Sequence, residues 1–461
     1  MKTGCIAEQK LRKTYLKSVN VTLILLFCIT SVYSGDRGGW LSLFNGKDLT
    51  GWHQLNGKAD FKVEKGVLTG TMVANTPNSF LVADNEYSDF ILELDLLADE
   101  GMNSGIQLRS ISKPEIMGGR VHGYQCEVDA TPRAWSGGIY DEARREWLYT
   151  GDLNPEGKKA FKQGKWNHYR IECIGTNIRT WINGKPVAWV IDDMDSRGLI
   201  ALQVHAVTAE AGPGSKIRWK NIRIKTTNLQ ADLSPGIFIV NLIPNTLSEA
   251  EEAEGWKLLF DGKTTNGWIT PGNDKFPSEG WKITDGVITT VPNRPDNPVR
   301  GSDIVSEEKF GAFELQFEFN FTEGSNSGVK YCIGNGGPGI GLEYQILDDQ
   351  RHPDAKAGVD GNRTLASLYD LIPAKKQARF TKGPDNWSSG RIVLYPDNRV
   401  EHWLNGIKVL EYVRGSEAYL LLVSKSKYAD YKDFGMVKES PVLLQYHQDE
   451  VKFRSIKIRK L

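Results

Sequence analysis

Hydrophobic and polar residues alternate along short stretches over most of the chain, and Asn-Gly and Asp-Gly pairs separate many of these stretches. Alternation with a period of two predicts β-strands that bury one face and expose the other. Short alternating runs joined by such pairs favour antiparallel hairpins over helices. In each half of the chain we expect fifteen or so strands that stack as two antiparallel sheets. The predicted fold class is therefore all-β.

The whole pattern of strands and turns occurs twice along the chain. Each copy spans roughly 190 to 210 residues, which is far longer than a solenoid repeat and indicates two complete domains. We place the first domain at residues 36–227, a connector at 228–252 and the second domain at 253–461. An apolar run in the connector, residues 237–243, predicts a strand or a packed segment. The clearest matching pairs are Leu43–Trp52 with Leu259–Trp268, Asn103–Ile106 with Asn326–Val329, Trp181–Gly184 with Trp403–Gly406, and Leu202–His205 with Leu444–His447.

Charge and cysteine usage argue against several classes of protein. Lys and Arg total 57, and Asp and Glu also total 57, so the net charge is zero. A nucleic-acid binder usually carries a basic excess, so we expect no nucleic-acid partner. Of five cysteines, Cys126, Cys173 and Cys332 lie within the predicted domains and lack CxxC spacing, which argues against a zinc site or a full disulfide framework. The chain also lacks the P-loop, HExxH and GxSxG patterns.

The N-terminus has the pattern of an export signal. Basic residues between positions 10 and 17 precede an apolar run, residues 21–29, which is too short to span a membrane comfortably. We interpret residues 1–35 as a signal peptide and expect an exported protein in the periplasm or at the cell surface, with no transmembrane span after the signal. Cys28 offers a lipoprotein alternative, but Phe27 stands where a small residue is expected. A retained anchor is the other alternative.

Polar side chains gather on one face of three strands in the first copy. With a period of two, Gln107 shares a face with Arg109, Gln125 with Glu127, and Gln203 with His205. If these strands belong to one sheet, a carboxylate, an imidazole, a guanidinium and three amides converge. Such a set offers both donors and acceptors, as sugar hydroxyls require. The six residues are Gln107, Arg109, Gln125, Glu127, Gln203 and His205.

A polar loop between residues 133 and 147 follows the middle strand and predicts the rim of this face. Trp135, Tyr140 and Trp147 offer stacking surfaces, and Asp141, Glu142 and Arg144 add polar contacts. The loop is alternatively a solvated surface, and Glu127 is alternatively a simple cross-strand partner of Arg109. In the second copy Cys332 replaces Arg109 and most of the polar loop is lost. The residues retained there as equivalents are Lys330, Glu343, Gln345, Tyr369 and His447.

Several stretches together resemble the 3-keto-disaccharide hydrolase family, also described as 3-keto-glucoside-1,2-lyase/3-keto-2-hydroxyglucal hydratase. They are FNGKDLTGW, NSGIQLRS, GYQCEVDA, SGGIYDEARREW, WINGKPV, LQVH and IRWKNIRIK. The resemblance covers both copies. It implies a concanavalin A-like jelly-roll sandwich in each copy, an exported location and an enzyme that acts on oxidised sugars. The second copy departs from the pattern at Cys332 and in its loop, so we expect the activity in the first domain.

The chemistry implied by this resemblance begins with removal of the C2 proton beside a C3 ketone. The C1 aglycone then leaves by β-elimination, and water adds to the 2-hydroxyglucal, so that the net reaction is hydrolysis. His205 is the expected base, and Arg109 is expected to stabilise the enolate with Gln107 or Gln203. Glu127 is a base, an acid or a ligand of a divalent metal ion. No cofactor is certain, and metal dependence stays open.

Two other functions fit parts of the same pattern. A non-catalytic, lectin-like protein would use the same amide-rich face and aromatic residues to bind carbohydrate, and its two domains would provide avidity. A direct two-carboxylate glycosidase would need a second acid on the strand, but the same-face neighbour of Glu127 is the neutral Gln125. The sequence does not determine the glycosidic linkage, the aglycone or the oligomeric state.

Overall fold

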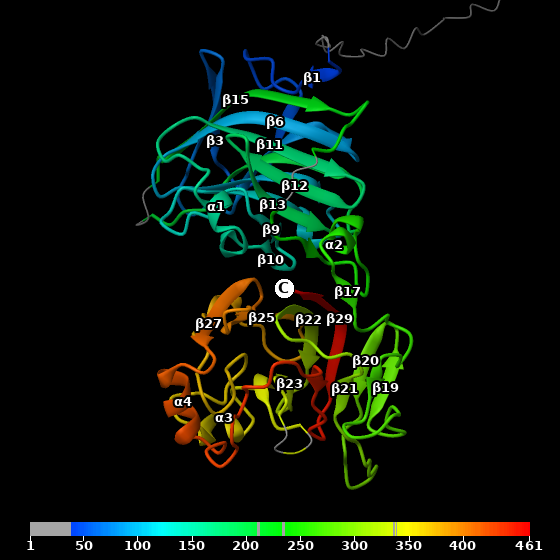
Figure 1. Cartoon of the computed structure of the whole chain (residues 1–461). Coiled ribbons are helices and arrows are strands. Elements are labelled where there is room, and N and C mark those ends of the chain that lie inside the picture. The colour runs from blue at the N-terminus through cyan, green and yellow to red at the C-terminus, as the bar shows by residue number, and fades with distance from the viewer. Residues whose placement is uncertain (1–37, 210–212, 233–235, 335–336, 338) are drawn as a thin grey trace, which may run out of the picture. The chain divides into compact units, whose positions relative to one another are not determined.

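The computed structural model describes residues 38–209, 213–232, 236–334, 337 and 339–461. The predicted signal peptide, residues 1–35, lies outside the described residues. Within the described ranges, every helix is too short or too polar to cross a membrane. Nearly all regular structure is β-strand, and the strands form two separate sandwiches, one in each half of the chain (Figure 1). The all-β jelly-roll prediction is confirmed.

The first sandwich consists of a nine-stranded sheet and a seven-stranded sheet. The larger sheet has the order β16-β13-β12-β11-β6-β15-β4-β3, with β1 paired to β15, and its neighbours β6, β11, β12 and β13 can be followed in Figure 1. The smaller sheet has the order β10-β9-β8-β7-β14-β5-β2. The elements are β1 Trp40–Ser42, β2 Trp52–Asn56, β3 Asp60–Glu64, β4 Val67–Thr71, β5 Ser79–Tyr87, β6 Phe90–Ala98, β7 Asn103–Ile111, β8 His122–Asp129, β9 Ile139–Glu142, β10 Glu146–Tyr149, α1 Pro155–Lys158, β11 Asn167–Ile174, β12 Asn177–Ile182, β13 Lys185–Ile191, β14 Gly198–Val204, β15 Lys216–Lys225 and β16 Val240–Asn241.

Alternation along the strands places the main core of this sandwich between its two sheets. On β8, Tyr124, Cys126 and Val128 are fully buried in that core, as their spacing predicts. On β5, Leu81 joins the same core, but its neighbour Phe80 belongs to a separate apolar cluster. That cluster covers the other face of the seven-stranded sheet at β5 and β14, and its members are Phe80, Val82, Val121, Leu199 and Ala201, with Leu55 packed against them. The outer face of this sheet is therefore apolar at these positions of β5 and β14.

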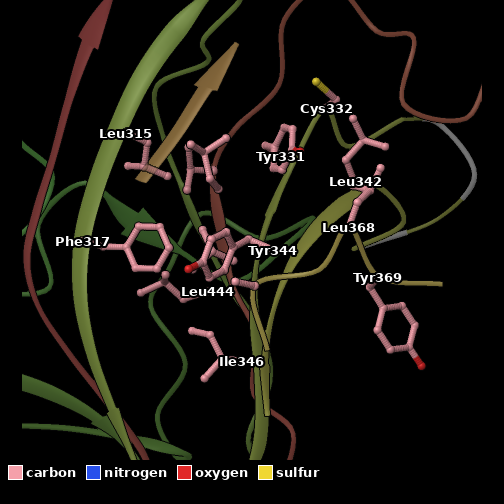
Figure 2. Packing of buried hydrophobic residues seen from close by; sticks show 14 of the residues in the cluster. Leu315, Phe317, Tyr331, Cys332, Leu342, Tyr344, Ile346, Leu368, Tyr369 and Leu444 are labelled. Carbon is pink, nitrogen blue, oxygen red and sulfur yellow. The ribbon is translucent and has the colours of Figure 1, made fainter. Parts of the chain in front are cut away.

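The second sandwich consists of an eight-stranded and a five-stranded sheet. Their orders are β19-β20-β29-β22-β25-β26-β27, with β17 paired to β29, and β18-β21-β28-β23-β24. Phe317, Tyr331, Tyr344 and Leu444 converge in the buried cluster between these sheets (Figure 2). The elements are α2 Glu249–Ala253, β17 Lys257–Leu258, β18 Trp268–Ile269, β19 Trp281–Thr284, β20 Val287–Thr290, β21 Ile304–Ser306, β22 Phe313–Phe321, β23 Asn326–Tyr331, β24 Leu342–Leu347, α3 Asp354–Ala357, β25 Ser388–Leu394, β26 Arg399–Leu404, β27 Ile407–Val413, α4 Glu417–Ser424, β28 Leu443–Leu444 and β29 Val451–Lys460.

The connector contains a strand, as its apolar run predicts. Residues Val240–Asn241 form β16, which pairs in parallel with β13 at the edge of the first sandwich. Ile239, beside this strand, is only 5 % exposed. The connector therefore adds an edge strand to the first sandwich and is not a loose tether.

Candidate functional site

Strands β14, β7 and β8 carry the predicted polar face and are consecutive neighbours in the seven-stranded sheet. Gly105 of β7 lies opposite Gln203 of β14 on one side and opposite Glu127 of β8 on the other. Two residues further along β7, Gln107 lies opposite Gln125. Because side chains alternate between faces, these four polar side chains point away from the main core. The three strands thus form one sheet, as the converging face requires.

Hydrogen bonds join the polar side chains of β7 and β8 into one chain that ends at a carboxylate. The Ser110 hydroxyl donates to Gln107 Oε1 at 2.7 Å, and Gln107 Nε2 donates to Gln125 Oε1 at 2.5 Å. Gln125 Nε2 then donates to Glu127 Oε2 at 3.0 Å. Each of these four side chains is buried. The chain fixes the orientation of both amides, because each amide accepts on one side and donates on the other.

Glu127 is a buried acid with a perturbed proton affinity. Besides Gln125, it accepts hydrogen bonds from Asn103 Nδ2 at 2.6 Å and from Arg133 Nη2 at 3.0 Å. These donors favour the carboxylate, but burial outweighs them and raises the pKa of Glu127 to about 7. An acid with a pKa near neutrality can both give and take a proton at physiological pH.

The glycine of the Asn-Ser-Gly triplet, which occurs in both copies, has a steric reason. A Cβ atom added at Gly105 would lie 2.2 Å from the Gln125 side chain, and one added at Gly328 would lie 2.2 Å from Glu343 Oε1. The polar side chains of the neighbouring strand therefore pack directly over each glycine. A larger residue at either position would push them off the face.

Gln203 and His205 present unused hydrogen-bonding groups beside this network. Gln203 is fully buried, yet neither of its amide atoms has a hydrogen-bond partner among the residues that the structure describes. A buried amide without partners is costly, so a bound ligand is the natural partner. His205 lies one residue beyond the end of β14, and its Nδ1 is 2.7 Å from the carbonyl oxygen of Ala206. A carbonyl only accepts, so Nδ1 carries the proton and Nε2 keeps its lone pair.

Arg109 does not lie on the polar face, and this prediction is wrong. A register shift interrupts β7 after Leu108, and Arg109 adopts a left-handed backbone with φ of 47°. Such a bulge reverses the side-chain alternation. The guanidinium is buried and donates to the carbonyls of Ser88 at 2.6 Å and Gly175 at 2.8 Å, and to Asp89 Oδ1 at 2.9 Å. Arg109 therefore ties turns of the sandwich together and does not converge with Gln107.

The second sandwich meets the same structural need with a different residue. Cys332, which replaces Arg109, has the same left-handed backbone, with φ of 50°. Arg414 supplies the guanidinium there, 3.1 Å from the Cys332 sulfur, and donates to the carbonyls of Gly435 and Val437. The exchange of Arg for Cys is therefore a change in structural support and says nothing about activity.

Two of the predicted rim residues also point away from the face. Asp141 faces the main core side of β9 and accepts hydrogen bonds from Arg144 at 2.7 Å and Arg145 at 2.5 Å. Arg145 also binds Asp192 at 2.5 Å, and the buried Tyr124 hydroxyl donates to that same carboxylate at 2.6 Å. Asp141 and Arg144 thus belong to a buried ion network that anchors the loop. The prediction that these two residues contact a ligand is therefore wrong.

The alternate residues of β9 do lie on the polar face. Tyr140 is opposite Gln125 in the register, and burial raises its pKa. Glu142 accepts hydrogen bonds from Arg120 Nη2 at 2.9 Å and from Asn78 Nδ2 at 3.4 Å. These two side chains extend the face across a fourth strand.

An aromatic group borders the face beside Glu127. Trp135 and Trp147 meet edge to face with ring centroids 4.7 Å apart, and Tyr140 contacts Trp147 at 5.2 Å. The Arg133 guanidinium lies 4.9 Å and 4.8 Å from the two indole centroids while it binds Glu127. Trp135, Tyr140 and Trp147 thus form one aromatic group, and their role in stacking on a sugar stays a prediction.

Sequence reasoning missed three polar residues of the site. Asn103 and Arg133 bind Glu127, and Asn78 binds both Glu142 and the backbone N–H of Ala206. Asn103 had a visible signal, because the Asn-Ser-Gly triplet occurs in both copies. Arg133 and Asn78 lie in loops, where no periodicity reports the direction of a side chain.

The face of the second sandwich keeps the layout but changes the chemistry. Gln345 lies opposite Gly328, where the first sandwich has Glu127, and Glu343 lies opposite Lys330, where the first has a pair of amides. The predicted exchange of Glu and Gln is thus confirmed by the register. Lys330 Nζ is 3.7 Å from the buried Glu343 carboxylate, and burial raises the pKa of Glu343.

The remaining second-copy equivalents have separate partners. The Tyr369 hydroxyl donates to Asp354 Oδ2 at 2.7 Å, and its ring lies at the edge of the buried cluster (Figure 2). His447 is exposed and lies near His352 and Asp449. The second face therefore pairs the partly exposed Lys330 with the buried Glu343 in place of the hydrogen-bond chain of the first.

Two stretches of the chain match one family model, and several known proteins are similar to parts of the chain. Residues 39–225 and 255–459 each match the family model described as the 3-keto-alpha-glucoside-1,2-lyase-like domain. A 3-keto-disaccharide hydrolase from Bacteroides thetaiotaomicron is 34 % identical over 235 residues, which cover 46 % of this chain and 80 % of that protein. A crystal structure described as a glycosyl hydrolase from Parabacteroides distasonis is 29 % identical, with a TM-score of 0.42, and covers 47 % of this chain and 99 % of its own. A second such structure from that organism is 25 % identical, with a TM-score of 0.35, and covers 45 % and 99 %.

Proposed function

The chain belongs to the 3-keto-alpha-glucoside-1,2-lyase-like family, and from this premise we propose that it cleaves 3-keto-glycosides by elimination and hydration on the polar face of the first sandwich. The single observation that carries the proposal is the state of Glu127. It is a buried acid with a pKa of about 7, at the end of a hydrogen-bond chain, across Gly105 from the unpartnered Gln203. The strand spacing puts the Cα atoms of Gln203 and Glu127 about 10 Å apart on the same face, with the Gln125 side chain packed over Gly105 between them.

Elimination needs a base for the C2 proton and an acid for the departing aglycone. In the neutral ring of His205, Nδ1 carries the proton that it donates to the carbonyl of Ala206, so Nε2 is the nitrogen that acts as the base. Glu127 has the raised pKa that an acid requires, since burial keeps part of it protonated at neutral pH. In this step the C2–H and C1–O bonds break, a C1–C2 double bond forms, and the aglycone leaves as an alcohol with the Glu127 proton.

Hydration then restores both residues. The Glu127 carboxylate takes a proton from water as the oxygen bonds to C1, and the His205 imidazolium, which exchanges its proton with solvent before this step, gives a proton to C2. Negative charge develops on the C3 oxygen in both steps, and an unpartnered Gln203 amide N–H is the available donor for it. Each cycle therefore consumes one water and ends with Glu127 protonated and His205 neutral.

Deuterium incorporation separates this route from direct hydrolysis. We expect the 3-keto sugar that the protein releases in D2O from a 3-keto-disaccharide to carry deuterium at C2. Direct displacement at C1 would leave the C2 hydrogen in place. Mass spectrometry of the product, corrected for enolisation without enzyme, makes the distinction. Cleavage with no deuterium at C2 would contradict the elimination, and binding without cleavage would favour a lectin-like protein.

We also propose that the protein is exported. The support is the basic and apolar pattern of residues 1–35. N-terminal sequencing of the protein recovered from the periplasmic and membrane fractions tests it. A new N-terminus close to Gly35 is expected, and recovery of the intact chain from the cytoplasm would contradict the proposal.

A further inference from the structure

We propose that the second sandwich holds a divalent metal ion between His352, His447 and Asp449. One ring nitrogen from each histidine and one carboxylate oxygen of Asp449 lie within 4.8 Å of one another. Two imidazoles and a carboxylate are a ligand set typical of zinc and of related first-row metals. The inference concerns metal binding alone and does not depend on the proposed reaction of the first sandwich.

The backbone holds two of the three ligands in place. His352 lies in the turn after β24, and its N–H donates to the carbonyl of Asp348 at 3.0 Å. Asp449 precedes β29, and its Oδ2 accepts the N–H of Asn326 at 3.0 Å, which leaves Oδ1 for a metal. A ligand fixed by such contacts binds metal more tightly than a free side chain.

Only the second copy combines all three ligand types. Its His447 is the repeat equivalent of His205, and Asp449, two residues further, stands where the first copy has Val207. Counting along the strand from Gln345 and Glu127, His352 stands where the first copy has Ala134.

The equivalent histidine also differs in its freedom to bind. In the first sandwich Nδ1 of His205 is bound to the carbonyl of Ala206. In the second, the exposed His447 has a ring contact with His352, at 6.2 Å between centroids.

The geometry requires a small closure around the ion. Ligand atoms at zinc bond lengths lie about 3.3 Å apart in a tetrahedral site, and the three atoms lie within 4.8 Å of one another, so any pair farther apart than 3.3 Å must close in. The exposed His447 can move without loss of packing. His352 Nδ1 accepts the N–H of Asp354 at 3.2 Å, and binding through Nε2 would break this contact at a cost of roughly tenfold in affinity. We therefore expect a micromolar site, not a nanomolar one.

Three protein ligands leave at least one position of the ion open. Asn326, which holds Asp449, also lies 3.2 Å from the amide of Gln345 on the second polar face. The ion would thus lie at the edge of that face, where a water or a sugar oxygen can complete its coordination.

Cobalt and zinc titration of the chelator-treated full chain tests the proposal. Cobalt in a tetrahedral site gives visible absorption bands, and we expect one saturable site with those bands that zinc displaces. His352→Ala and His447→Ala should each weaken zinc binding at least thirtyfold. Asp449→Asn keeps the shape of the side chain and loses its charge, so we expect a smaller loss, near tenfold.

His53→Ala is the matched control, because His53 and Asp84 form an exposed pair at 2.8 Å that lacks a third ligand. It should bind zinc like the unmodified chain. Circular dichroism and the melting temperature without metal show whether each variant is folded, and zinc should raise that temperature in the control but not in His447→Ala. No saturable cobalt site at millimolar metal, or equal affinity in all folded variants, would overturn the proposal.

Discussion

Glu127 is the residue whose state decides the chemistry of the face. Its acid role requires the protonated form, and its pKa is about 7 because burial outweighs the donors around it. The protonated fraction falls as the pH rises through the pKa. We therefore predict that kcat on a 3-keto-disaccharide declines above pH 7, by about tenfold per pH unit well above it. The measurement is kcat from pH 5 to 10, and a rate that keeps rising to pH 9 would contradict the acid role.

The acid role of Glu127 also predicts a dependence on the leaving group. Glu127→Gln keeps the shape and the hydrogen-bond partners but cannot give a proton, so kcat on a 3-keto-disaccharide should fall about 100- to 1000-fold. A 4-nitrophenyl 3-keto-glucoside needs no acid, because its aglycone leaves as a stable anion. The variant should lose less than tenfold on that substrate. Equal losses on both substrates would show that Glu127 does not protonate the aglycone.

Arg109 is predicted to act on stability and not on chemistry. Arg109→Ala removes three hydrogen bonds and the buried guanidinium that joins the turns at Ser88 and Gly175, so we expect about 2–3 kcal/mol less stability of the first sandwich. Arg197→Ala is the control, since Arg197 is 60 % exposed and its pair with Glu86 spans 3.3 Å. Calorimetric melting measures both variants. A folded Arg109→Ala protein with an unchanged melting temperature and no activity would return Arg109 to the catalytic set.

At the scale of the element, the face depends on the absence of a side chain on β7. Gly105→Ala would place a Cβ 2.2 Å from Gln125 and displace the chain of amides that orients Glu127. We predict at least tenfold lower kcat and about 1–3 kcal/mol less stability. Gly383→Ala is the control, because nothing lies within 4 Å of its Cβ position and its φ is not positive. Wild-type turnover by folded Gly105→Ala would show that the hydrogen-bond chain is dispensable.

The alternation of polar and apolar residues predicted most of the polar face of the first sandwich. The prediction failed where the backbone is irregular. The period of two placed Gln107, Gln125, Glu127 and Gln203 correctly, because β7, β8 and β14 stay regular through these residues. It failed at Arg109, where a bulge turns the backbone into the left-handed region. No glycine next to Arg109 in the sequence signals this bulge. The element and fold were therefore predictable from pattern, but the direction of a side chain beside a bulge was not.

Loops set the second limit of the prediction. The stretch from Arg133 to Trp147 contains many charged residues, but their number alone does not show which way each side chain points. Its hairpin sends Tyr140 and Glu142 to the face, and Asp141 to the buried network with Arg145. The network became visible only with Asp192, which lies far along the chain and meets Arg145 through the fold.

At the scale of the whole molecule, the two sandwiches share a fold and differ in their polar faces. The first has an acid with a pKa near neutrality and an unpartnered amide, whereas the second has the Lys330–Glu343 pair. Duplication therefore preserved the packing positions more closely than the polar positions. It also left the second copy with a set of candidate metal ligands that has no counterpart among the described residues of the first.

The most direct measurement is turnover of a 3-keto-disaccharide, beside its unoxidised parent, by the full chain and by His205→Ala and His447→Ala. We predict cleavage of the 3-keto-disaccharide only, because β-elimination needs the acidic C2 hydrogen beside a ketone. His205→Ala should lose at least 100-fold in kcat, and His447→Ala should lose less than threefold. Equal cleavage of the unoxidised sugar, or a greater loss from His447→Ala than from His205→Ala, would contradict elimination on the face of the first sandwich.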